Sequence, residues 1–91
     1  MSMDKKQIEM NRIVDMIRTR QYQVVSSSIK DNSVNIIVEK TMTPELLTTK
    51  DLEATWITNF LKSQGWQVSS TSFPENKIVV EFVKVVEVLG P

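Results

Sequence analysis

The sequence predicts an α+β fold built from two αββ units, with a four-stranded antiparallel sheet and both helices on one face of it. Two observations lead to this fold class. Each half of the chain has an amphipathic helical segment followed by two strand-like runs, and the two halves resemble each other. The chain has 91 residues, which is enough for a single core. We therefore expect one domain over residues 1–91, with pseudo-repeats at 4–40 and 48–84 and a strand-like extension at 85–91.

The first helix is predicted to run from Asp4 to about Arg20. Asp4 followed by Gln7 resembles a capping box, which satisfies free backbone N–H groups at a helix start. Apolar residues then recur at helical spacing, and they are Ile8, Met10, Ile13, Met16 and Ile17.

The second helix is predicted to begin near Thr48, with Asp51 three residues further on. Its apolar residues occupy the corresponding positions, and they are Leu52, Ala54, Ile57, Phe60 and Leu61. Gly65 is suited to the left-handed conformation that ends many helices. An earlier start after Thr43 stays open, because Pro44 is favourable at the first helical position.

Each helix is followed by two runs with strand character, joined by the turn-forming connectors KDNS and PENK, so each pair predicts a hairpin. The runs span residues 22–29, 34–40, 66–73 and 78 to about 88. Alternation predicts that one side of the first strands faces the helices, carrying Tyr22, Val24, Ser26 and Ser28 in one half and Trp66, Val68, Ser70 and Ser72 in the other. The reverse side, which includes Ile37, Glu39, Val79, Glu81 and Val83, is mixed in character and is expected to stay open.

The two halves align without a gap when the chain is shifted against itself by 44 positions. Residues 13–40 then lie over 57–84 with seven identities, where about one or two are expected by chance. The identical pairs are Ile13/Ile57, Gln23/Gln67, Val24/Val68, Ser26/Ser70, Ser28/Ser72, Asn32/Asn76 and Lys40/Lys84. The ungapped register favours an internal duplication, while shared patterning of any two αββ units remains the alternative.

The composition excludes several kinds of chemistry. The chain has no Cys and no His, which removes thiolate and imidazole catalysis and zinc–thiolate sites, and two glycines cannot build a phosphate-cradling loop. Lys and Arg number 11, as do Asp and Glu, so there is no global field for nucleic acid or anionic lipid. We expect no cofactor, metal or small-molecule substrate, and a remote enzyme alternative rests on a carboxylate pair at Glu39 and Glu81.

The C-terminal run IVVEFVKVVEVLGP keeps strand character beyond the end of the first repeat. An exposed apolar strand of this length invites pairing with another chain, although it can equally complete the sheet or pack on the first helix. The residues predicted to bind a partner are Val85, Val86, Val88 and Leu89 of this tail with Ile37, Val79 and Val83 of the open face.

A second hypothesis is binding to double-stranded DNA through the hairpins. Lys30 and Lys77 lie in or beside the predicted turns, and Arg18, Arg20 and Lys62 lie near the helix C-termini. Cations at helix C-termini also interact favourably with the helix dipole without any ligand.

The segments VVSSSIKDNSVNIIVEK and FLKSQGWQVSSTSFPENKIVVEFVK, each with a long strand, polar turn and second strand, resemble the double-wing DNA-binding domain of middle-promoter transcription activators from T-even phages. The resemblance spans most of the chain and implies a saddle-like sheet that approaches DNA. The chain differs from that family in having no third strand between residues 40 and 48 and no basic excess.

From these observations we expect a non-enzymatic interaction module that binds a protein, or itself as a homodimer, through the open sheet face or the C-terminal strand. A DNA-binding transcription regulator is the alternative. The first residues carry no apolar signal-peptide core and no run of 18 apolar residues occurs, so the expected location is the cytoplasm, or the host cytoplasm for a viral protein, with no membrane partner.

Overall fold

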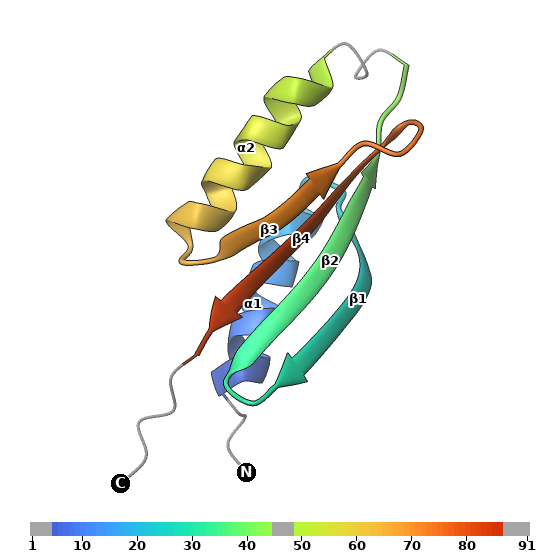
Figure 1. The fold of residues 1–91 in the computed structure, drawn as a ribbon. Coiled ribbons are helices and arrows are strands. Elements are labelled where there is room, and N and C mark those ends of the chain that lie inside the picture. The colour runs from blue at the N-terminus through green and yellow to red at the C-terminus, as the bar shows by residue number, and fades with distance from the viewer. Residues whose placement is uncertain (1–4, 45–48, 87–91) are drawn as a thin grey trace, which may run out of the picture.

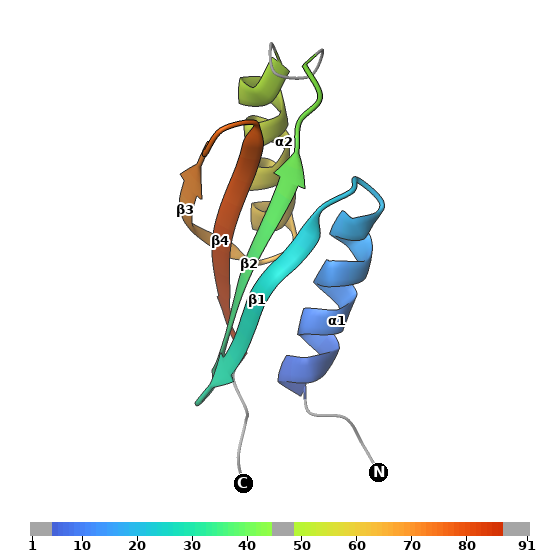
Figure 2. The same cartoon turned by 90° about the vertical axis from the view of Figure 1, so that its right-hand side faces the viewer.

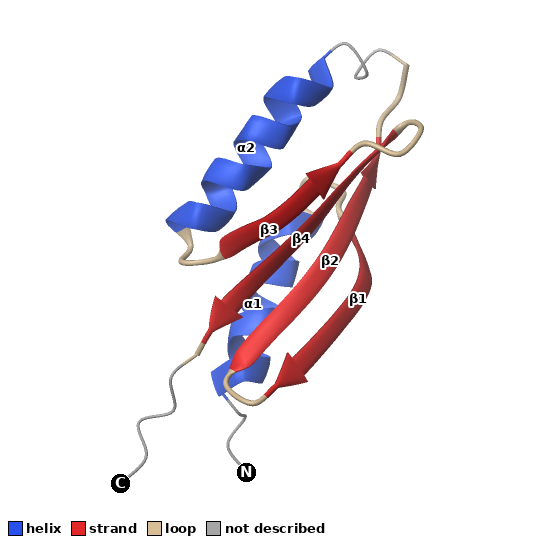
Figure 3. Cartoon of the chain, in the orientation of Figure 1, coloured by secondary structure: helices blue, strands red, loops and turns tan. Residues whose placement is uncertain are grey.

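A computed structural model describes residues 5–44 and 49–86. Two helices and four strands follow one another in the order αββαββ, as Figure 3 shows by colour. The elements are α1 (Lys5–Arg18), β1 (Gln23–Lys30), β2 (Ser33–Thr41), α2 (Lys50–Ser63), β3 (Gln67–Ser72) and β4 (Lys77–Val85).

The four strands form one antiparallel sheet in the order β1-β2-β4-β3, which confirms the predicted fold class. The two hairpins therefore meet through their second strands, β2 and β4. The β1–β2 and β3–β4 turns lie at opposite ends of a long molecule that measures 52 × 22 × 19 Å (Figure 1).

Both helices pack on the same face of the sheet. The side chains on that face of the central strands are fully buried, and they are Val34, Ile36 and Val38 of β2 with Ile78, Val80 and Phe82 of β4. They form one core cluster with Ile13 and Ile17 of α1 and with Ile57 and Leu61 of α2. Figure 2 shows α1 running alongside β1, and α1 contacts β1 and β2 whereas α2 contacts β3 and β4. No described helix covers the opposite face.

The central position of β4 bears on the two alternatives for the C-terminal run, which were pairing with another chain and completion of the sheet. Its described part completes the sheet, because β4 pairs with β2 along its whole length and with β3 from Val79 to Val83. The physical reason is burial: β2 and β4 carry three fully buried apolar side chains each, whereas the serine-rich β1 and β3 have none. The most apolar strands gain most from a central position, and the polar strands form the edges.

The strand also ends earlier than predicted. β4 stops at Val85, and the next residue, Val86, is only 9% exposed and belongs to the core cluster. Its backbone N–H donates to the Asn32 carbonyl oxygen at 2.7 Å. Val86 is therefore not an exposed partner-binding residue, and Val88 and Leu89 lie outside the described residues.

The helix boundaries agree with the predicted ones to within a few residues. α1 ends at Arg18, α2 begins at Lys50 and Pro44 is in a turn. The alternative of an earlier helix start also involves residues 45–48, which lie outside the described residues. Gly65 has a φ of 86° after α2, as its sequence position predicts.

Several irregular features recur at a spacing of 44 residues. The strands β2 and β4 begin and end at positions 44 apart, and Asp31 and Glu75 in the two hairpin turns both have a φ of 55°. The hydrogen bond from the Met42 N–H to the Asn76 carbonyl, at 2.7 Å, has its counterpart in the bond from Val86 to Asn32. In the ladder between β2 and β4, Ile37 pairs with Glu81, which is its own counterpart at this spacing.

Neither α1 nor α2, the helices of the described part of the chain, has the length and apolar character needed to span a membrane.

Candidate functional site

The face of the sheet opposite the helices, here called the open face, is left uncovered by both described helices. β2 contributes Ser33, Asn35, Ile37, Glu39 and Thr41, and β4 contributes Lys77, Val79, Glu81, Val83 and Val85. Most of these side chains are half-buried by their neighbours on the sheet, and Val85 is 60% exposed. Ile37, Val79, Val83 and Val85 form an apolar strip along the centre of this face. Four of the predicted partner residues, Ile37, Val79, Val83 and Val85, thus lie together on this face.

A β-bulge in each edge strand changes which serines lie on the open face. In β1, Val24 pairs with Val38 but Ser26 pairs with Ile37, so Val25 is an extra residue in the ladder. Beyond the bulge the alternation is reversed. Ser26 and Ser28 therefore lie on the open face beside Ile37, and the prediction that they face the helices is wrong.

The same change occurs in β3. Val68 pairs with Phe82 and Ser70 pairs with Glu81, which leaves Ser69 as the extra residue. Ser70 and Ser72 consequently flank the apolar strip from the second edge of the sheet, again opposite to the prediction. Thr71 and, in β1, Ser27 turn to the helix side instead, where they line shallow grooves beside α2 and α1.

Of the two glutamates near the centre of the open face, Glu39 has an ion-pair partner and Glu81 has none among the described Lys and Arg side chains. The Lys77 ammonium lies 2.9 Å from a Glu39 carboxylate oxygen, and this hydrogen bond, together with the charge of Glu39, raises the pKa of Lys77. Glu81 has no ion pair with any described Lys or Arg. Its carboxylate accepts a long hydrogen bond of 3.5 Å from the Ser70 hydroxyl.

The two glutamates of the remote enzyme hypothesis are diagonal neighbours rather than a facing pair. Glu39 pairs with Val79 in the ladder, whereas Glu81 pairs with Ile37. Glu39 is engaged by Lys77, so only one of the two carboxylates is available to a ligand. Within residues 5–44 and 49–86, no group of three or more acidic side chains could hold a metal ion.

The cations of the DNA hypothesis do not gather on one surface. Lys30 pairs with Ser33 at one end of the β2–β4 ladder and Lys77 pairs with Thr41 at the other, roughly 27 Å apart at the usual strand rise. The exposed Arg18 and Lys62 lie at the ends of the helices. The Arg20 guanidinium lies 3.2 Å from Glu53 and 3.7 Å from the centre of the Trp56 ring, within the molecule's own contacts.

A polar cluster on the helix side, here called the Glu53 cluster, joins the two halves. The Tyr22 hydroxyl donates to one Glu53 oxygen at 2.8 Å, and Arg20 and Lys40 lie 3.2 and 3.5 Å from the other oxygen. Burial alone would raise the pKa of Glu53, but the hydrogen bonds from Tyr22 and Arg20 and the charges of Lys40 and Arg20 lower it overall. Burial and the bond to Glu53 raise the pKa of Tyr22.

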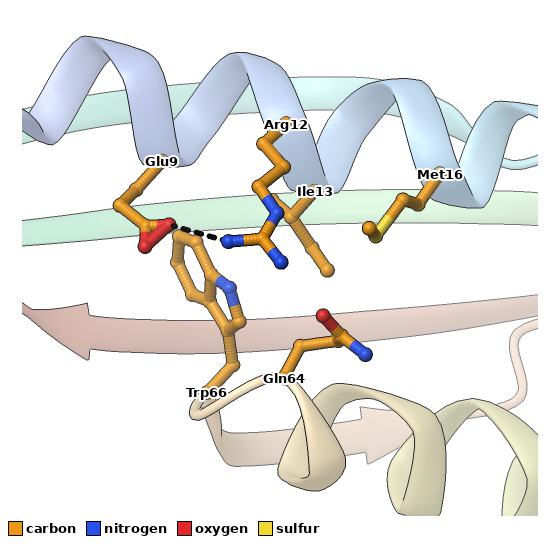
Figure 4. Close-up of a pocket in the computed structure, with 6 residues that line it drawn as sticks. All are labelled: Glu9, Arg12, Ile13, Met16, Gln64 and Trp66. Carbon is orange, nitrogen blue, oxygen red and sulfur yellow. Dashed lines mark ion pairs between the residues drawn. The ribbon is translucent and has the colours of Figure 1, made fainter.

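A counterpart of this cluster occupies the other end of the core. Glu9 of α1 lies 2.9 Å from Lys84 of β4, whose ammonium is 5.8 Å from the Trp66 ring centre and also donates to the Gln64 carbonyl at 3.3 Å. Figure 4 shows Trp66 reaching toward α1 beside Glu9, with Arg12 paired to the same glutamate. The cavity there has a volume of about 10 Å³ and holds at most about one water, which is too small for a ligand. The cluster is therefore a structural contact that connects the two halves.

Sequence reasoning missed both clusters, although the signal was present. Glu9 and Glu53 are identical residues 44 positions apart, as are Lys40 and Lys84, and Tyr22 and Trp66 are both aromatic. An acid, a base and an aromatic that all recur at the repeat spacing indicate a shared structural contact.

No family model matches this chain, and no curated protein or solved structure matches it either.

Proposed function

We propose that this domain is a non-enzymatic module that binds another protein, or a second copy of itself, through the open face of the sheet. The observation that carries the proposal is the apolar strip of Ile37, Val79, Val83 and Val85, which no described helix covers. Contiguous apolar surface on a small domain marks interaction sites far more often than isolated apolar residues do.

The surroundings of the strip support the same function. Ser26 and Ser28 flank it on β1, and Ser70 and Ser72 flank it on β3. Hydroxyl groups can donate and accept hydrogen bonds and lose little conformational freedom when covered. An apolar centre with a polar rim is the usual arrangement of a protein–protein interface.

Internal duplication would explain why this face is left open. The sequence identities and the structural features that recur at a spacing of 44 residues support two homologous αββ units related by a pseudo-twofold axis between Ile37 and Glu81. Each unit supplies one helix, and the two helices together cover only one side of the joined sheet.

DNA binding is the less supported alternative. The cations that would contact phosphate lie at the two ends of the sheet or on the helix side, and Lys77 is already paired with Glu39. Specific DNA recognition usually requires several phosphate contacts from one contiguous basic surface.

The experiment compares two variants that each replace two apolar side chains by glutamine, on opposite sides of the molecule. The open-face variant is Val79→Gln with Val83→Gln, and the matched helix-side control is Ile8→Gln with Leu52→Gln, which replaces side chains 47% and 72% exposed. Peptides are selected on the wild-type protein from a random phage-displayed library, and their affinities are measured by fluorescence anisotropy. Self-association is measured by size-exclusion chromatography with light scattering.

The open-face variant should lose peptide affinity, or any self-association, by at least about tenfold, and the helix-side control should be unchanged. A wild-type protein that is monomeric and selects no binding peptide would refute the proposal. So would peptides that survive the open-face change and are lost in the helix-side control.

A further inference from the structure

We propose that the partner segment on the open face presents a lysine or arginine flanked by apolar side chains, and that Glu81 is the residue that selects it. The inference rests on the proposed function and specifies the chemistry of the partner. Its basis is the position of one uncompensated carboxylate at the centre of the apolar strip.

Glu81 lies in the middle of the open face. It pairs with Ile37 across the ladder and has Val79 and Val83 as its neighbours on the same side of β4. The side chain is half-buried. A partner that covers the apolar strip must therefore also cover this carboxylate, because the apolar side chains surround it.

The lysine and arginine side chains of the described residues supply no counter-ion for Glu81. All 11 Lys and Arg side chains of the sequence belong to the described residues, and none is ion-paired with Glu81. The neighbouring ion pair on the open face joins Lys77 to Glu39, with 2.9 Å between the ammonium nitrogen and a carboxylate oxygen. Lys30 lies two strands and two side-chain rows away on the same face, roughly 15 Å at the usual spacings. The polar contact recorded for Glu81 is the 3.5 Å hydrogen bond from Ser70.

Covering an unpaired carboxylate with an apolar partner is unfavourable, because the charge loses its hydration without gaining a new contact. A basic side chain placed over Glu81 restores that contact, and its aliphatic stem covers the neighbouring valines. Charge complementarity therefore favours a basic partner over an apolar or acidic one.

A second copy of this chain fits the same centre poorly. If two open faces stack with their centres aligned, the two Glu81 carboxylates approach each other with no basic side chain between them. Lys77 and Glu39 already form an ion pair with each other within each copy, so Lys77 is not available to Glu81 of the second copy. The favoured occupant is therefore a different chain with a basic residue.

The test is a charge-swap cycle between the protein and its selected peptides. Peptides are selected from a random phage-displayed library on the wild type, on Glu81→Gln and on the control Glu75→Gln, which alters an exposed carboxylate in the β3–β4 turn. The wild type and the control should enrich Lys or Arg beside apolar residues, and Glu81→Gln should lose this enrichment.

A selected peptide is then resynthesised with its basic residue replaced by norleucine. The replacement should weaken binding to the wild type by about tenfold and binding to Glu81→Gln by less than about twofold. The charge reversal Glu81→Lys should prefer the same peptide with glutamate at that position. Matching unfolding curves for all variants show that each is folded.

The outcomes separate this inference from the proposed function. If the open-face variant abolishes binding while the cycle shows no coupling to Glu81, the basic partner is refuted and the binding face stands. If light scattering instead shows a wild-type dimer that the open-face variant converts to a monomer, a second copy is the occupant and the inference is overturned. If only the helix-side control loses binding, both proposals fail.

Discussion

Glu53 is the residue at which three side chains of the first half of the chain contact one carboxylate of the second half. Its side chain is 11% exposed and accepts a hydrogen bond from the Tyr22 hydroxyl at 2.8 Å. The side-chain nitrogens of Arg20 and Lys40 lie 3.2 and 3.5 Å from its other oxygen. These partners come from the α1–β1 connection and from β2, whereas Glu53 is in α2. An enclosed carboxylate with three donors is stabilising only while all of its contacts are formed.

The pKa shifts determine how stability should vary with pH. The net lowering of the Glu53 pKa means that its contribution is complete above the ordinary value of 4.5 and is lost as the pH falls through the lower pKa of the folded state. The raised pKa of Tyr22 has the opposite consequence. Its contribution is present below the ordinary value of 10.0 and is lost as the pH rises above it.

Replacing Glu53 with glutamine should lower the free energy of unfolding by about 1–2 kcal/mol at neutral pH, because Lys40 loses its counter-ion in an enclosed position. The variant should also lose less stability than the wild type as the pH falls below the ordinary value of 4.5, since the carboxylate that titrates is gone. Urea unfolding followed by tryptophan fluorescence at several pH values measures both effects.

The matched control is Glu75→Gln in the exposed β3–β4 turn, which should change stability by less than about 0.5 kcal/mol. Equal losses in the two variants would show that the Glu53 cluster contributes nothing specific.

At the scale of the elements, the two helix-to-strand connections use the same backbone conformation with different residues. Gly65 has a φ of 86° after α2, and Gln21, at the equivalent point after α1, has a φ of 69°. Glycine adopts this left-handed region without strain, whereas glutamine does not. The first connection is therefore the more strained of the two.

Exchanging glycine and non-glycine residues at these two sites should give stability changes of opposite sign. Gly65→Ala should destabilise the protein by about 1 kcal/mol, and Gln21→Gly should stabilise it by up to about 1 kcal/mol. A Cβ at Gly65 would meet the Lys84 ammonium at 3.4 Å, an ordinary contact, so the backbone conformation is the dominant cause. Thermal and urea unfolding provide the measurement, and two changes of the same sign would contradict the explanation.

The strands show where prediction from sequence succeeds and where it stops. Strict alternation correctly places Ile37, Val79 and Val83 on one face, because β2 and β4 are regular. It fails for Ser26 and Ser70, since a single extra residue in β1 and β3 reverses the alternation beyond it. The extra residues are Val25 and Ser69, and neither is a glycine, which is the residue that would mark a bulge in the sequence.

At the scale of the whole molecule, neither half has a core of its own. The buried cluster contains Ile13 and Ile17 from the first helix together with Phe82 and Trp66 from the second half, and the Trp66 and Phe82 rings meet edge to face at 5.2 Å. One helix on a two-stranded hairpin is too small to be stable alone. The two halves should therefore fold as one cooperative unit.

Unfolding should consequently be two-state. Both tryptophans, Trp56 and Trp66, belong to the second half, whereas far-UV circular dichroism reports on both helices. The urea transitions seen by fluorescence and by circular dichroism should coincide, and a fragment of residues 1–44 should show no cooperative transition. Separate midpoints, or a folded fragment, would demonstrate independent halves.

The sequence by itself determined the αββαββ order, the end of the second helix just before Gly65 and the regular strands whose apolar residues alternate, because these features depend on local periodicity and backbone preference. Only the tertiary structure decided that β4 lies at the centre of the sheet, that Val86 is buried and that the edge serines turn to the open face. These features depend on which strands pair and on one-residue shifts in register, and burial of the most apolar strands settles them only when the whole chain is folded.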